Sequence, residues 1–137
     1  VNAVLSANKP IVAVGEGGAR FLDQVPDLFI GWSQSWLVTQ THGVVAGGSI
    51  YTYPHNLGVM PGDSIQVYNS PGVATYAVND PSGLSNRILR QYDNLDHYEV
   101  VSEAGRFYMW GFRESPADMT QNGRDLFTNS VYGTAKP

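Results

Sequence analysis

Short runs of alternating residues, broken by glycine or proline about every ten residues, constrain the fold of this chain most strongly. The chain contains 15 glycines and 8 prolines, in turn sequences such as "GEGG" (15–18), "MPGD" (60–63) and "NDPSG" (79–83). Strands are predicted at 10–14, 35–41, 49–54, 64–69, 73–79, 86–92, 97–102, 106–112 and 126–135. This pattern predicts an all-β fold, an antiparallel β-sandwich or jelly roll with about eight strands.

The 137 residues fall within the size range of one domain, so a single domain spanning 1–137 is expected. Residues 1–30 are the least regular part and are interpreted as an extended arm toward a neighbouring subunit or a loosely packed terminal segment. A short helical turn is one reading of 21–29. The start at Val1 suggests processing or excision from a longer chain.

Charge and composition exclude several classes of partner. The formal net charge is −4, and basic residues form no stripe that could neutralise nucleic-acid phosphates. No run of 18 apolar residues could cross a bilayer, so no membrane insertion is expected. Cysteine is absent, which excludes disulfides and thiolate metal sites. Charged residues make up only 15% of the chain, against about 25% in an average domain, and this suggests a surface with a partner.

No motif predicts catalysis, a metal or a cofactor. "GEGGAR" (15–20) has arginine where a dinucleotide-binding loop needs glycine, and a hairpin turn explains its glycines. "DNLDH" (93–97) concentrates potential metal ligands, but its spacing fits no zinc or calcium signature. Asp93 and Asp96 leave open a hydrolase with a carboxylate pair. Ser49 lacks the glycine pattern of a nucleophile elbow. A non-enzymatic protein is therefore predicted.

Aromatic residues are the more suggestive feature, because Trp and Tyr are enriched in interfaces and stack on sugars. The candidate interface or glycan-binding residues are Trp32, Trp36, Tyr51, Tyr53, Tyr68 and Trp110. Strand alternation in 49–54 and 64–69 predicts that the three tyrosines face away from the core. The run 106–112 is apolar on both faces, so a second cover is expected, and another subunit could supply it.

The segment 31–69 joins a tryptophan-bearing strand, a glycine turn and a Thr/Tyr-rich strand to "HNLG", a proline and a strand with alternating Ile and Val. The residues that carry this pattern are His55, Asn56, Leu57, Gly58, Pro61, Ile65 and Val67. It resembles the C-terminal domains of bacteriophage tail fibres and related virion appendages. Residues 122–137 loosely resemble the closing strand and basic tail of such domains.

This resemblance implies a structural protein on the virion surface that attaches to the host. The expected partners are other copies of the chain, with a trimer favoured, other virion proteins, and a host-surface glycan or protein. His55, Asn56, Leu57, Gly58 and Pro61 are interpreted as a rigid structural corner, with Gly58 at positive φ and a buried His55. Two alternatives stay open: a capsid decoration or cement protein that stabilises the phage head, and a carbohydrate-binding module.

Overall fold

The computed structural model describes residues 1–79, 81, 83 and 85–135. Its strands are β1 (Ile11–Val14), β2 (Ser35–Gln40), β3 (His42–Val45), β4 (Ser64–Gln66), β5 (Val73–Asn79), β6 (Ser85–Gln91), β7 (His97–Glu103) and β8 (Phe107–Trp110). Its helices are α1 (Asn2–Ser6), α2 (Gly15–Leu22) and α3 (Gln121–Ala135), with the short 3-10 helices η1 (Trp32–Gln34), η2 (Ser49–Tyr51) and η3 (Pro116–Asp118).

Eight strands of the described residues form one mixed sheet with the order β1-β8-β7-β6-β3-β4. β5 pairs with β7 and carries β2 on its other side. β1 pairs with β8 in parallel, and every other pairing is antiparallel. The expectation of a mostly β fold with about eight strands is therefore confirmed, but a purely antiparallel sheet is wrong. The sandwich or jelly-roll arrangement is not confirmed.

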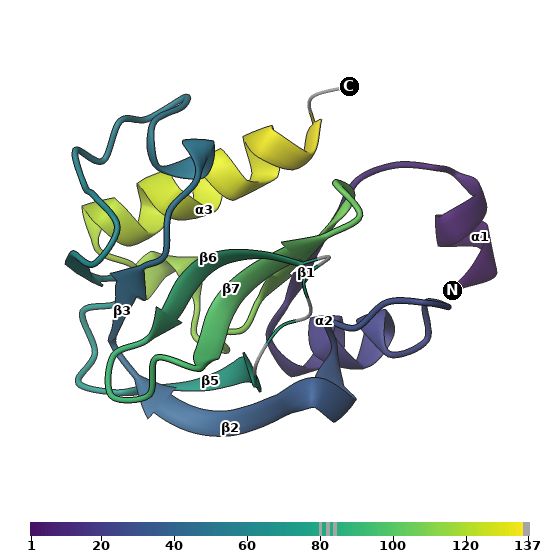
Figure 1. Ribbon diagram of the computed structural model, residues 1–137, viewed down its shortest axis with the longest axis horizontal. Helices are drawn as coiled ribbons and strands as arrows, with labels where there is room; N and C mark the ends of the chain where they lie inside the picture. Colours follow the sequence, from purple (N-terminus) through teal and green to yellow (C-terminus); the bar gives the residue numbers. More distant parts are fainter. Residues whose placement is uncertain (80, 82, 84, 136–137) are drawn as a thin grey trace.

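Two apolar clusters lie on opposite faces of the central strands. α3 packs on the first cluster and α2 on the second. Figure 1 shows α3 above and α2 below the central strands. On β8, Trp110 belongs to the α3 cluster and Met109 to the α2 cluster, because successive side chains alternate across a strand. The prediction that 106–112 is covered on both faces is confirmed. Both covers come from the chain itself, with no need of another subunit.

Seven of the nine predicted strands coincide with strands of the structure, and β3 was missed. The predicted strand at 49–54 is wrong, because this segment forms η2 and then a turn with a cis peptide bond between Tyr53 and Pro54. The turn at 79–83 and the basic tail lie partly outside the described residues.

The predicted closing strand at 126–135 is also wrong, because the segment lies in α3. Thr120 precedes the helix, and its hydroxyl accepts a hydrogen bond from the backbone N–H of Gly123 at 3.0 Å, which caps the first turn. Leu126, Asn129 and Ser130 are all buried, and their spacing places them on one helix face. Tertiary packing of this face outweighs the β propensity of the valine, threonine and tyrosine in the segment.

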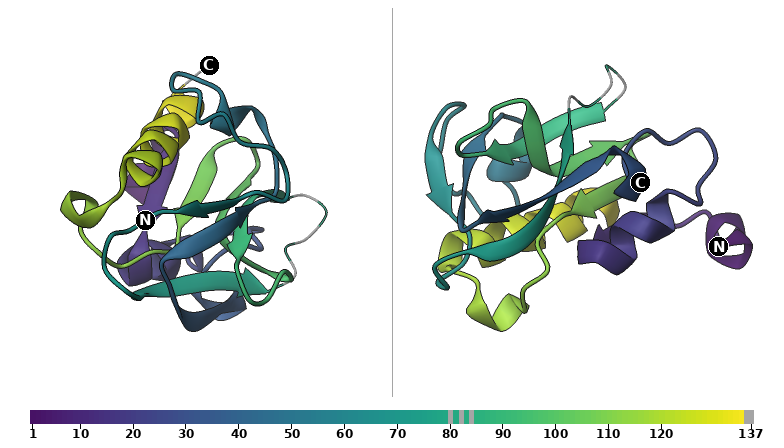
Figure 2. Two further views of the ribbon diagram at one scale, coloured as in Figure 1. Left: turned by 90° about the vertical axis from the view of Figure 1, so that its left-hand side faces the viewer. Right: turned by 90° about the horizontal axis from the view of Figure 1, so that it is seen from below.

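Residues 11–22 are regular, although the sequence suggested an arm or an irregular segment for 1–30. β1 joins the sheet and α2 follows at once, so the hairpin turn expected at "GEGG" is wrong. A Cβ at Gly18 would lie 2.4 Å from the carbonyl carbon of Ala13, so glycine lets α2 pack directly on β1. The helical turn expected at 21–29 overlaps only the end of α2. The first ten residues project from the body of the molecule (Figure 2).

None of the helices in the described part of the chain is long and apolar enough to cross a membrane.

Candidate functional site: a tyrosine-lined groove

Three side chains form a polar row across neighbouring strands on the α3 face of the sheet. Asn86 on β6 is in register with Ser102 on β7, and Ser102 is in register with Tyr108 on β8. The Asn86 amide donates to the Ser102 hydroxyl at 3.2 Å. Ser102 is 1% exposed, whereas its neighbours in the row are more accessible. This face of the sheet packs mainly apolar side chains, and the row adds a strip of uncharged hydrogen-bonding groups to it.

This row lies beneath two adjoining hollows of about 440 Å³ and about 180 Å³. Ser49, Ile50 and Tyr108 line both hollows, so we treat them as one continuous site, the tyrosine groove. Its other lining residues are Ala46, Gly47, Gly48, Tyr53, Ser85, Asn86, Arg87, Ile88, Ser102, Asn129, Tyr132 and Gly133. The groove thus opens between the segment around η2, the sheet and the C-terminal half of α3.

Asn129 joins the two walls of the groove. Its side-chain Nδ2 donates to the carbonyl of Ile50 at 2.6 Å and to the carbonyl of His55 at 2.7 Å. Its Oδ1 accepts from the His55 backbone N–H at 2.9 Å. Asn129 is fully buried, so these bonds are shielded from competing water. One asparagine on α3 therefore fixes the course of residues 50–55.

The residues predicted as a structural corner form a turn that continues this wall. Gly58 has φ +65°, as expected, and its N–H donates to the Asn56 side chain at 2.9 Å. The Leu57 N–H donates to the Tyr51 carbonyl, and its side chain packs partly buried against the α3 cluster. Pro61 is exposed ahead of β4. The expected burial of His55 is wrong, because its side chain is 50% exposed, with Nδ1 3.9 Å from an Asp125 carboxylate oxygen.

Tyr53 and Tyr132 stand together at the smaller hollow. Their rings meet edge to face at 5.1 Å, and their hydroxyl oxygens are 3.3 Å apart. The hydrogen bond with Tyr53 raises the pKa of Tyr132 above that of a free tyrosine. The side chains are 52% and 38% exposed, so ring surface remains available to a ligand.

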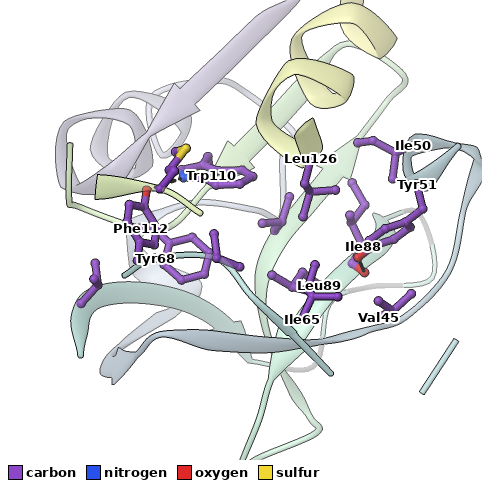
Figure 3. Close-up of a cluster of buried hydrophobic side chains, with 14 residues drawn as sticks. Val45, Ile50, Tyr51, Ile65, Tyr68, Ile88, Leu89, Trp110, Phe112 and Leu126 are labelled. Atoms are coloured by element: carbon purple, nitrogen blue, oxygen red, sulfur yellow. Dashed lines mark hydrogen bonds between the residues drawn. The ribbon is translucent and has the colours of Figure 1, made fainter. Parts of the chain in front are cut away.

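Three of the predicted interface or glycan-binding aromatics, Tyr51, Tyr68 and Trp110, are instead buried in the α3 cluster, where Figure 3 shows them among other apolar side chains. Tyr51 lies in η2, where the period of two does not apply, and its hydroxyl donates to the Ile88 carbonyl. Tyr68 lies beyond the end of β4, where Val67 and Tyr68 are both buried, and its hydroxyl accepts from the Trp110 indole at 3.2 Å. Burial raises the pKa of Tyr68 to about 12.

The two remaining tryptophans lie away from the groove lining. Trp32 is half-buried, with its ring centre 4.8 Å from that of Tyr76 and the Arg20 guanidinium 3.9 Å above its ring. Trp36 on β2 is 60% exposed and stacks on His97 at 6.3 Å. The predicted aromatic set is therefore divided, and only Tyr53 lines the groove.

The acidic segment 93–97 forms a hydrogen-bonded surface cluster. Asp93 accepts from Gln40 at 3.1 Å and also from Gln91. His97 contacts the Gln91 side chain and stacks on Trp36. Within the described residues, no group of three or more His, Asp or Glu side chains could hold a metal ion.

Sequence reasoning missed Asn86, Ser102, Tyr108, Asn129 and Tyr132. The first three belong to predicted strands, but their alignment depends on the register of three strands that no local pattern reveals. Asn129 and Tyr132 are three apart and share a helix face, a signal that was lost when 126–135 was read as a strand.

Comparison with protein-family models, curated protein sequences and solved structures found no match to this chain.

Proposed function

We propose that this protein is a non-enzymatic attachment module of a bacteriophage virion, from a tail fibre or a head appendage, and that it binds a host-surface glycan in the tyrosine groove. The observation that carries the binding proposal is the groove itself, in which the polar row Asn86–Ser102–Tyr108 lies beside the exposed tyrosines 53 and 132. Saccharides need such a combination of hydrogen-bonding groups and aromatic surface.

The sequence pattern of 31–69 supports the virion assignment by its resemblance to appendage domains. In the structure this segment includes β2, β3, η2 and the corner, and it supplies one wall of the groove. This proposal includes the β-sandwich arrangement typical of such domains. It also includes a homotrimer on the particle surface, in which several weak glycan contacts would combine by avidity.

A glycan array probed with the purified protein tests the binding proposal. The panel should contain bacterial surface polysaccharides and animal glycans. Tyr132→Ala removes an aromatic wall and is expected to lower the signal at least about tenfold, which corresponds to loss of a contact worth about 1.4 kcal/mol. Tyr92→Ala is the matched control, because Tyr92 is 59% exposed and lies outside the groove lining.

Light scattering after size exclusion tests the proposed assembly. A trimer supports a fibre module, whereas a monomer that binds glycans supports the carbohydrate-binding module instead. No binding by the parent to any glycan in the panel would contradict the groove proposal.

Capsid decoration is a second candidate function, favoured by the projecting N-terminal segment. Residues 1–10 include α1, none of whose residues is buried, and they are held to the body by Arg106, which donates to the carbonyls of Leu5 and Lys9. Such a segment could lie across a neighbouring capsid subunit. Cosedimentation with empty capsids tests this, and deletion of residues 1–8 should abolish it without affecting glycan binding.

A further inference from the structure

We infer that the tyrosine groove selects an uncharged saccharide unit over one that carries a carboxylate, sulfate or phosphate. This inference rests on the proposed glycan-binding function and defines its ligand class. It depends on which side chains of the lining point into the groove.

Among the described residues that line the groove, Arg87 is the one with a charged side chain, and the strand register places that side chain on the opposite face of the sheet. Arg87 is in register with Val101, which belongs to the α2 cluster. Its guanidinium carbon lies 5.8 Å from the ring centre of Tyr98, another member of that cluster. Its Nη2 donates to the Pro81 carbonyl at 2.6 Å. Arg87 therefore contributes main chain to the groove and no charge.

The polar row offers neutral hydrogen-bonding groups. Asn86 uses one amide hydrogen on Ser102, which leaves its carbonyl oxygen and a second amide hydrogen. The hydroxyl hydrogen of Ser102 and the hydroxyl of Tyr108 make no hydrogen bond among the described residues. Sugar hydroxyls both donate and accept, so they can bond to Asn86 and Tyr108, the accessible members of the row, while the buried Ser102 accepts from Asn86.

Among the described residues, the groove lining offers no counter-charge to an ionised group that enters it. Removing a charge from water is costly unless the site supplies an opposite charge or several strong donors. The net charge of −4 adds a further, weak repulsion against anions. Neutral units, such as hexoses and N-acetylhexosamines, avoid this cost.

The test compares neutral and acidic glycans that share a backbone. Oligogalacturonate and the same oligosaccharide after reduction of its carboxyl groups to hydroxymethyl groups form one matched pair. Sialylated glycans and their desialylated forms make a second. In any pair for which binding is detected, the neutral glycan is expected to give a signal at least about tenfold stronger than the acidic one. Binding of the neutral glycan should change less than about twofold between about 50 mM and about 500 mM NaCl.

Two variants distinguish the groove from the opposite face. Asn86→Lys places a cation at an exposed position of the polar row and should weaken binding of the neutral glycan. Arg87→Gln removes the guanidinium and should change the binding of neutral and acidic glycans by the same factor, since a side chain on the opposite face cannot pair with an anionic group in the groove. Thermal unfolding shows whether each variant is folded.

Acidic glycans that bind more tightly, lose affinity in salt, and gain affinity with Asn86→Lys would overturn this inference while leaving the proposed function intact. A loss of acidic-glycan binding in Arg87→Gln that the neutral glycans do not share would also overturn it. If no glycan of either kind binds the parent, both the inference and the proposed function fail.

Discussion

The side-chain amide of Asn129 on α3 pairs with the main chain of His55 in both directions. Oδ1 accepts from the His55 N–H at 2.9 Å, and Nδ2 donates to the His55 carbonyl at 2.7 Å. The same nitrogen also donates to the Ile50 carbonyl at 2.6 Å. One wall of the tyrosine groove is therefore held to the other by a single buried side chain.

Asn129→Asp should destabilise the protein by about 2 kcal/mol or more, because two buried carbonyls lose their donor and face a carboxylate. Chemical denaturation measures this loss. The hydrogen exchange of the Leu57 amide, which bonds to the Tyr51 carbonyl beside this clamp, should also accelerate.

Asn2→Asp is the matched control, because Asn2 is exposed in α1 and the same chemical change there should have little effect. Equal stability of Asn129→Asp and the parent would show that the Asn129 clamp does not hold the loop.

Glu99→Gln should make the protein more stable at neutral pH. Glu99 is fully buried, and neither carboxylate oxygen has a hydrogen-bond partner among the described residues. Burial, together with the nearby negative charge of Asp93, raises the pKa of Glu99 well above that of an exposed glutamate. The folded protein therefore keeps a proton that the unfolded chain releases, and this difference favours unfolding as the pH rises.

The advantage of Glu99→Gln should be absent below about pH 4, where both states of the parent are protonated. It should then grow by about 1.4 kcal/mol per pH unit until the pH reaches the raised pKa of the folded state. Urea unfolding at a series of pH values tests this, with exposed Glu114→Gln as the control. A constant difference between variant and parent across the series would refute the assignment.

Gly58→Val should destabilise the corner by about 1–2 kcal/mol, because a β-branched residue is strained at φ +65°. Gly58→Asn should cost less, since asparagine tolerates this conformation. A Cβ at Gly58 would meet no atom within 4 Å, so any difference reports backbone conformation and not a clash. Thermal denaturation measures the stability of both variants. Equal losses of stability in Gly58→Val and Gly58→Asn would show that the positive φ is not the cause.

Trp110→Ala and Trp36→Ala should differ sharply in stability, although the sequence pattern grouped both residues as interface candidates. Trp110 is 1% exposed, and its truncation should cost about 3–5 kcal/mol. Trp36 is 60% exposed, so its loss should cost less than about 1 kcal/mol. Similar losses in the two variants, measured by denaturant unfolding, would contradict the assignment of Trp110 to the core.

Alternation and turn chemistry were sufficient to predict most of the sheet. They failed where an element depends on its neighbours. Ser49–Tyr51 reads as a strand, but the Asn129 clamp and the burial of both Ile50 and Tyr51 hold it in η2. In α3, the capping residue Thr120 and the buried spacing of Leu126 and Ser130 were present in the sequence, yet β-prone residues masked them.

The groove was less predictable than the fold. Its floor is set by the register that aligns Asn86, Ser102 and Tyr108, and register is a property of paired strands. Tyr53 was identified from the sequence through the alternation of a strand predicted at 49–54, and it is exposed as expected although this segment forms η2 and a turn. Tyr132 lies 79 residues further along the chain and meets Tyr53 only through the placement of α3.

Glycan binding by two variants at Gly133 tests the groove most directly. A Cβ at this position would lie 3.5 Å from the Tyr108 hydroxyl, so the position faces the groove and has room for a methyl group. Gly133→Ala should fold at least as stably as the parent, since alanine favours a helix by up to about 1 kcal/mol, and should retain binding. Gly133→Trp should fill the groove and abolish the array signal in a protein that remains folded. Undiminished binding by folded Gly133→Trp would place the glycan site elsewhere on the molecule.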